Sequence, residues 1–209
     1  FEVNASHILH LEGERKSTDI TVREYLTKSD DWKSYYKLAR KTIDYRNCSG
    51  TTPIDPYILG VWLARGCEDS AIFKFEEKEI LDRVKQYAQQ NDLFVKEKPL
   101  IVEGKKKINF VFVSSDNGKN KLFSALNELN LINSKHIPHD FLISSKTTRM
   151  QLLAGILDAG AKVKDGCFKL KVKEQLLAEN IMQVARSLGL QVSIKMSFGT
   201  SYKLTISGP

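Results

Sequence analysis

The side chains that could bind a transition metal are few and unfavourably spaced. The three cysteines lie far apart and form no C-x-x-C pair; they are Cys48, Cys67 and Cys167. A His-x-x-His spacing occurs twice, at His7 with His10 and at His136 with His139. In a helix this spacing directs both rings to one side, but the first pair lies in a strand-like run and the second encloses Pro138. We therefore expect no disulfide framework, no zinc site and a reducing, intracellular compartment.

Regularly spaced lysines indicate a different chemistry, the binding of a polyanion. In the run 167–173 lysines alternate with apolar residues, so a strand would carry Lys169, Lys171 and Lys173 on one face. A solvated sheet face is the simpler explanation, but the part 160–209 holds eight basic and three acidic residues, with Lys195 and Lys203 among the basic ones. Such lysines contact phosphates and set affinity and its salt dependence. A second patch comprises Lys96, Lys98, Lys105, Lys106 and Lys107.

The composition agrees with a globular protein that has a polyanionic partner. The 209 residues are 42% hydrophobic, enough for one large domain or two small ones. The formal net charge of +7 suits nucleic acid but also occurs in proteins that bind none. No apolar run approaches the roughly 20 residues that cross a bilayer, and the first residues form no secretion signal. We expect a soluble chain without a membrane partner.

The elements that must position these lysines occur twice, with an offset of about 95 residues. Each copy has the order helix, strand, helix, strand, strand, with Phe73 falling on Phe168. The opening helices contain Gly60 and Gly155 at matching positions, beside Ala64 and Ala154. Since glycine costs a helix interior about 1 kcal/mol, we expect these helices to touch closely. The expected strands are 71–75, 93–96 and 108–114 in the first copy and 167–173, 190–195 and 202–207 in the second, with an extra strand at 161–163 and an extra helix at 121–129.

The opening helices also carry a family resemblance. Leu59-Gly-Val-Trp-Leu-Ala-Arg-Gly66 and Leu153-Ala-Gly-Ile-Leu-Asp-Ala-Gly160 resemble the two signature helices of LAGLIDADG homing endonucleases, in the two-copy form found inside inteins. The resemblance covers about residues 56–207. It implies an α+β fold in which two pseudo-symmetric repeats form a saddle on double-stranded DNA, with the lysine patches facing the duplex.

The resemblance also implies a metal centre, and the sequence departs from it. In the family each signature helix ends in an acidic residue that binds a divalent cation, which requires oxygen ligands. The matching positions here are Arg65 and Gly160. A guanidinium has no acceptor atom, so we expect impaired cleavage and no cofactor, with Mg²⁺ bound only if cleavage survives. The substitute ligand candidates are Glu68, Asp69 and Asp158.

Two catalytic residues are implied by the resemblance. Lysines assist catalysis near the metals in this family, and Lys171 corresponds to one of them. A loose alignment gives Val113 as its counterpart in the first copy, which would remove a third catalytic group. The run Phe1–His7 resembles an inner strand of an intein splicing domain, and His7 corresponds to the splicing histidine of a Thr-x-x-His motif that reads Asn4-Ala-Ser-His7 here.

The first fifty residues are expected to contain part of that splicing domain and a connecting helix. Thr21 with Glu24 forms a capping box, an amphipathic helix covers Trp32–Tyr45, and Asn47–Pro56 is a linker. The predicted divisions are 1–50, 51–140 for the first repeat and 141–209 for the second. Without an initial Cys or Ser and a final His-Asn pair, we expect the chain not to splice by itself.

Three functions are compatible with the sequence. The first is an intein-encoded, cleavage-impaired endonuclease domain that binds double-stranded DNA. The second is an active, metal-dependent, site-specific endonuclease that uses substitute ligands. The third is a structural remnant that supports splicing without binding DNA. For the first we expect a monomer that works with splicing segments and a host protein, in cis or in trans, in the cytoplasm or nucleus where that host resides.

Overall fold

The computed structural model describes residues 3–45, 52–102, 105–114, 120–197 and 201–208, without the side chains at 99–102, 105–110 and 112. Contacts divide the chain into two compact units, Phe1–Lys41 and Thr42–Pro209. The first division expected from the sequence was at residue 50, inside the segment 46–51 that lies outside the described residues. No helix in the described ranges is long and apolar enough to cross a membrane.

The smaller unit is a three-stranded antiparallel sheet with two short helices. Its strands, in the spatial order β2-β1-β3, are β1 (Ile8–Glu12), β2 (Ser17–Thr21) and β3 (Lys37–Leu38), and its helices are α1 (Val22–Thr27) and α2 (Asp30–Tyr35). The predicted capping box is confirmed, because the Thr21 side chain accepts from the Glu24 backbone N–H and the Glu24 carboxylate accepts from the Thr21 backbone N–H. Leu11, Ile20 and Tyr36 form a small separate core.

Two predictions for this unit are wrong. The amphipathic helix expected over Trp32–Tyr45 ends at Tyr35, because Tyr36 is extended and buried and the following residues pair with β1. An inner strand was expected over Phe1–His7. Phe1 and Glu2 lie outside the described residues, and residues 3–7 contain a turn at Ala5 and Ser6 in place of a strand, closed by a hydrogen bond from the His7 backbone N–H to the Asn4 carbonyl. Strand β1 begins one residue after His7.

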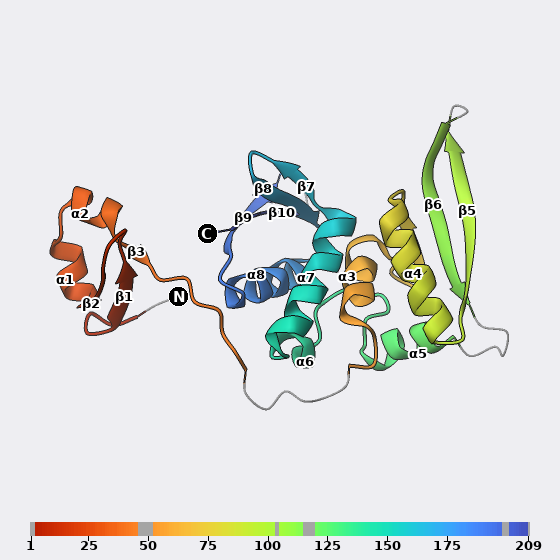
Figure 1. Ribbon diagram of the computed structural model, residues 1–209, viewed down its shortest axis with the longest axis horizontal. Helices are drawn as coiled ribbons and strands as arrows, with labels where there is room; N and C mark the ends of the chain where they lie inside the picture. The colour runs from red at the N-terminus through yellow and green to blue at the C-terminus, as the bar shows by residue number, and fades with distance from the viewer. Residues whose placement is uncertain (1–2, 46–51, 103–104, 115–119, 198–200, 209) are drawn as a thin grey trace. The chain divides into compact units, whose positions relative to one another are not determined.

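The larger unit contains both repeats in the expected order (Figure 1). The first comprises α3 (Pro56–Arg65), β4 (Ile72–Phe75), α4 (Lys78–Gln90), β5 (Phe94–Val102), β6 (Lys105–Ser114) and α5 (Lys121–Glu128). After the short α6 (His139–Leu142), the second comprises α7 (Lys146–Gly160), β7 (Lys162–Lys164), β8 (Cys167–Val172), α8 (Gln175–Ser187), β9 (Gln191–Ser197) and β10 (Ser201–Ser207). The expected extra strand and extra helix are therefore present as β7 and α5.

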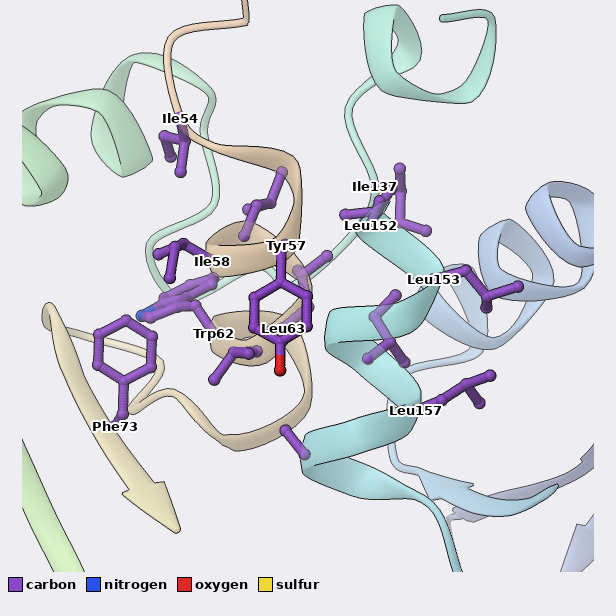
Figure 2. Packing of buried hydrophobic residues seen from close by; sticks show 14 of the residues in the cluster. Ile54, Tyr57, Ile58, Trp62, Leu63, Phe73, Ile137, Leu152, Leu153 and Leu157 are labelled. Atoms are coloured by element: carbon purple, nitrogen blue, oxygen red, sulfur yellow. The ribbon is translucent and has the colours of Figure 1, made fainter. Parts of the chain in front are cut away.

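Each repeat builds its own antiparallel sheet, and the two share one core. The first sheet has the order β4-β6-β5 and the second β7-β8-β10-β9. Apolar side chains on one face of each sheet pack with the helices into a single cluster that spans both repeats. Figure 2 shows Trp62 on the side of α3 that faces Phe73 of β4, while Leu152, Leu153 and Leu157 line α7.

Strand register establishes which residues of the two repeats correspond. Gly66 directly follows α3 and bridges Phe73 on β4, while Lys162 near the end of α7 pairs with Lys169 on β8. Phe75 lies three residues before α4 begins, as Val172 lies three residues before α8. Buried Phe73 and Phe75 therefore match buried Leu170 and Val172, rather than Phe73 matching Phe168 as the sequence alignment predicted. Lys74 is then the counterpart of Lys171.

The close contact predicted for the signature helices is confirmed. A Cβ atom added to Gly60 would lie 2.2 Å from the Leu152 carbonyl oxygen, and one added to Gly155 would lie 2.1 Å from the Tyr57 carbonyl oxygen. Both obstacles are backbone atoms of the opposite helix, which cannot move aside as a side-chain tip can. The two glycines let α3 and α7 pack backbone against backbone.

A buried arginine attaches the segment before the first repeat to this core. Arg149 on α7 is fully buried, and its guanidinium donates to the Ser144 carbonyl, the Ser187 hydroxyl and the Ile43 carbonyl. The Ile43 backbone N–H donates to the Ser187 carbonyl at 2.8 Å. Buried polar groups of this kind are stabilising only when all are hydrogen-bonded, so residues 42–45 form part of the larger unit.

Candidate functional site

A cleft of about 850 Å³ opens where α3 and α7 end. Both helices end in extended backbone, at Gly66 and at Ala161, and β4 and β8 return alongside them. Among the charged side chains that line it, cations outnumber anions. The cations are Arg65, Lys74, Lys135, Lys162, Lys169, Lys171 and Lys173, and the anions are Glu68, Asp69 and Glu174. An excess of cations in a cleft makes it attractive to polyanions.

Arg65 reaches from the end of one signature helix to the end of the other. Its Nε–H donates to the Ala159 carbonyl oxygen at 2.7 Å. That carbonyl belongs to the last turn of α7, where backbone acceptors lack helical partners. The guanidinium is consequently a C-terminal cap for α7, and its terminal amino groups remain in the exposed cleft.

Lys135 makes the corresponding contact at the end of α3, and sequence reasoning missed it. Its Nζ donates to the carbonyls of Trp62 at 3.1 Å, Leu63 at 3.2 Å and Gly66 at 2.7 Å. Burial lowers the pKa of Lys135 to about 8, because desolvation disfavours the ammonium form, while nearby Glu174 and Glu68 act in the opposite direction. The residue lies in an irregular loop before α6, so no periodic pattern marked it.

The remaining candidate ligands do not gather into a metal site. Gly160 offers no ligand atom. Asp158 accepts a hydrogen bond from the Tyr57 hydroxyl at 3.1 Å and is not among the cleft-lining residues. Glu68 and Asp69 do line the cleft and are exposed. Among the described residues, no three His, Cys, Asp or Glu side chains converge as a possible cation site. The helix ends therefore do not fit the divalent cation that this position would hold in the family that the sequence resembles, because the end of α3 presents the permanently charged guanidinium of Arg65.

Each repeat has a lysine at an equivalent strand position beside the cleft. Lys171 on β8 and Lys74 on β4 line the cleft, one from each repeat. The sequence alignment that matched Lys171 with Val113 is wrong, because Val113 lies on β6 with 4% exposure and faces the core. Both repeats keep a lysine at this position, so the expected loss of a third catalytic group is not supported.

The open face of the second sheet carries a row of lysines across three strands. Lys171 on β8 is directly opposite Lys203 on β10, and Lys203 is directly opposite Lys195 on β9. Lys169 and Lys162 pair on the same sheet. All except the partly buried Lys169, which forms an ion pair with Asp165 at 3.0 Å, are exposed. The alternate residues, including Leu170 and Leu204, are buried.

On the first sheet, fewer lysine side chains belong to the described residues than on the second. Lys74 and Lys98 are both opposite Phe110 in the ladder, so they share the open face with Lys96 two residues away. Lys96 and Lys98 are exposed and do not line the cleft. Lys105, Lys106 and Lys107 begin β6, but their side chains lie outside the described part of the chain.

The expected splicing histidine lies in the smaller unit. His7 is exposed in the turn before β1. His10, on β1, places its Nδ1 2.5 Å from an oxygen of Asp19 on β2. His136 and His139 also do not act as a pair in the structure, since His136 hydrogen-bonds to the Ser134 carbonyl and His139 begins α6.

Sequence comparison finds two similarities. Residues 136–205 match a family model described as homing endonuclease. A curated relative, the replicative DNA helicase DnaB of Mycobacterium intracellulare, is 29% identical over 163 residues, which is 74% of this chain and 24% of the relative. The chain thus spans about a quarter of the length of that relative.

Solved structures show the same architecture. The chain resembles I-DmoI in complex with DNA and Mn with a TM-score of 0.50 and 18% identity, over 75% of this chain and 90% of that one. For I-WcaI bound to its DNA recognition sequence the TM-score is 0.50 at 12% identity, with 85% and 82% covered. For the N-terminal LAGLIDADG domain of DUF199/WhiA it is 0.50 at 12% identity, with 82% and 89% covered. The chain therefore has the LAGLIDADG homing-endonuclease fold, and its residues 136–205 match the homing-endonuclease family model.

Proposed function

We propose that this protein binds double-stranded DNA through the open faces of its two sheets and cleaves it poorly. The observation that carries the proposal is the row Lys171, Lys203 and Lys195. Like charges directly opposite one another destabilise a sheet, so such a row is favourable only when a polyanion neutralises it. Phosphates of a duplex supply that charge and release their counterions on binding.

The shape of the fold supports a duplex as the ligand. Antiparallel ribbons fit the major groove of B-DNA, where base edges can be distinguished. Ser193 and Gln191 are exposed on the same side of β9 as Lys195, so polar groups lie next to the phosphate-binding row. I-DmoI and I-WcaI, which share the fold, are both described in complex with DNA.

Weak cleavage follows from the chemistry of the helix ends. Hydrolysis assisted by two hard cations requires carboxylate or carbonyl oxygens at the metals. Arg65 provides a fixed positive charge there, and Gly160 provides no side chain. Lys171 and Lys74 can still contact phosphate, but without a cation ligand they do not generate the nucleophile.

An active enzyme is the second candidate, and one observation favours it. Glu68 and Asp69 immediately follow α3 and line the cleft beside Arg65. Two adjacent carboxylates could hold one Mg²⁺ ion with water completing its shell. This candidate requires cleavage by the unaltered protein.

We also propose that the chain is part of an intein. The relative that it matches is a helicase of much greater length, and a nucleotide-hydrolysing motor would require a phosphate-binding G-x-x-x-x-G-K-[ST] motif, which this chain lacks. A homing-endonuclease fold aligned to a quarter of such a protein is what an in-frame insertion would give. His7 would then serve splicing, with the other segments and the host protein in cis or in trans.

The test of DNA binding and cleavage uses the purified chain and a randomised plasmid library. With Mg²⁺ or Mn²⁺ present, we expect selective retention that weakens as salt rises, and no strand breaks. Breaks by the unaltered protein would favour Glu68 and Asp69 as ligands, and variants Glu68→Gln and Asp69→Asn would then abolish them. If the protein neither retains nor breaks DNA, only the structural role remains.

A gain-of-function variant sharpens the test. The double substitution Arg65→Asp with Gly160→Asp should restore metal-dependent nicking. A Cβ at residue 160 would lie 2.8 Å from the Leu170 Cδ1 atom, a side-chain tip that can move. Gly160→Ala is therefore the matched control for folding. For the intein proposal, the reading frame that encodes the chain should continue into a host protein on both sides, with a Cys or Ser at the start of the insertion and a His-Asn pair at its end.

A further inference from the structure

We infer that the cleft at the helix ends binds a DNA phosphate without a metal, because Arg65 supplies the positive charge that a divalent cation supplies in the metal-dependent members of this fold. The inference rests on the proposed binding of DNA. It concerns a single phosphate site and its dependence on metal, which the DNA-binding proposal leaves open.

The direction of the two signature helices makes the site attractive to cations. The C-terminal end of a helix carries a partial negative charge from its unpaired carbonyls. Here the ends of α3 and α7 meet at one cleft, and a side-chain cation contacts each of them: Lys135 donates to the end of α3, and Arg65 donates to the end of α7. The protein thereby neutralises the partial negative charge of the helix ends with its own side chains, where a metal-dependent member of this fold would use a bound cation.

The contact of Arg65 prepares its guanidinium for an anion. The bond from Nε to the Ala159 carbonyl fixes the plane of the group and uses one of its five N–H donors. Among the described residues, no hydrogen bond or ion pair engages either terminal nitrogen, and both belong to a residue that lines the cleft. A planar fork with free terminal donors matches two oxygens of a phosphate.

The surrounding lysines select a phosphate over a carboxylate-bearing peptide. Lys74 and Lys171 enter the cleft from equivalent strands of the two repeats, and Lys162 and Lys173 line it as well. Lys171 also begins the row that continues to Lys203 and Lys195 on the open sheet face. A phosphate at Arg65 would thus be one of a series along a single backbone, which a short acidic peptide could not provide.

The experiment measures the affinity of the full chain for a labelled mixed-sequence duplex by fluorescence anisotropy, in EDTA and in Mg²⁺, at several salt concentrations. We expect no loss of affinity in EDTA. The variant Arg65→Gln keeps a donor for the Ala159 carbonyl but removes the charge and the fork. It should weaken binding roughly tenfold to a hundredfold and reduce the slope of log affinity against log salt by about 0.9.

Lys146→Gln is the matched control. Lys146 is exposed at the opposite end of α7, about 20 Å along the helix from Gly160. Its loss should leave affinity and salt slope close to those of the unaltered protein. Arg65→Lys should give an intermediate affinity, because it keeps the charge without the fork.

The outcomes separate this inference from the proposed function. Binding that requires Mg²⁺, or an Arg65→Gln variant with unchanged affinity and slope, would overturn the inference while DNA binding stands. If the unaltered protein binds no DNA, the proposed function fails and inorganic tripolyphosphate becomes the probe. A rise in melting temperature with tripolyphosphate in EDTA that Arg65→Gln abolishes would support the phosphate site, and no rise would overturn it.

Discussion

The two repeats share one scaffold but differ where they would meet DNA. Their signature helices are equivalent, with Gly60 and Gly155 making reciprocal backbone contacts. Their sheets are not. The second has four strands and a lysine row that crosses three of them, whereas Lys74 and Lys98 of the first are separated by Phe110 on the strand between them.

This difference indicates that packing and ligand chemistry respond to separate constraints. A change at the helix contact affects the core of both repeats at once, so both sides retain glycine. The helix ends lie at the cleft, outside that contact, and there the repeats carry Arg65 and Gly160. Substitutions at the helix ends would therefore leave the backbone contact between the helices unchanged.

The helix contact should be equally intolerant on both sides. Gly60→Ala and Gly155→Ala each introduce a Cβ that meets backbone atoms of the opposite helix, at 2.2 Å and 2.1 Å. We expect each to lower the free energy of unfolding by about 3 kcal/mol or more, measured by urea denaturation.

Gly166→Ala provides the control for this contact. Gly166 has φ of +70° and no atom within 4 Å of its added Cβ, so only backbone strain should appear, at about 1 kcal/mol. If Gly60→Ala destabilised the protein no more than Gly166→Ala does, the close backbone contact at Gly60 would be contradicted. If it destabilised the protein much less than Gly155→Ala does, the two helices would not be equivalent.

Removing a lysine from each sheet should affect the stability of the protein differently, as well as its DNA binding. Lys203→Thr removes the central charge between Lys171 and Lys195, so it should raise the free energy of unfolding by about 0.2–1 kcal/mol while lowering the salt slope of DNA binding by about 0.9. Lys98→Thr makes the same substitution opposite Phe110 and should weaken binding without stabilising the fold. Equal stabilisation by both variants would mean that β-propensity, rather than charge repulsion, is responsible.

A pH-dependent effect is expected at Lys135. Its folded pKa of about 8 lies below the ordinary value of 10.5, so between these values the unfolded chain binds the proton and the folded chain does not. Stability from this residue therefore rises as pH increases through that window, while the affinity of the cleft for phosphate falls as the charge is lost.

These opposite trends are measured as differences between the unaltered protein and Lys135→Met, by urea denaturation and by anisotropy. Cys67 also lines the cleft, so both proteins carry Cys67→Ser and the comparison isolates Lys135. Parallel trends in stability and affinity would show that another group dominates.

Much of the fold was predictable from the sequence because it is repeated and periodic. The glycine pair, the amphipathic helix α4 and the alternating strand β8 each follow from a local pattern with a single physical explanation. The helix predicted beyond Tyr35 failed because pairing of Lys37 and Leu38 with β1 overrides a local amphipathic pattern.

The candidate site was predictable only in part. Arg65, Gly160 and Lys171 lie inside elements that a pattern can locate. Lys135 lies in an irregular loop, and only its three bonds to the end of α3 reveal its role. Lys74 was missed because the turn after α3 differs in length from the turn after α7, and only the strand pairing shows the correct register.

The buried guanidinium of Arg149 sets where an autonomous fragment of this protein can begin. A fragment starting at the first repeat, near residue 51, would lack Ile43 and leave a buried cation without one of its acceptors. One starting at Thr42 would keep that acceptor and the bond between Ile43 and Ser187. The transferable module is thus longer than its repeats, and anyone grafting it into another host should carry this short leading peptide with it.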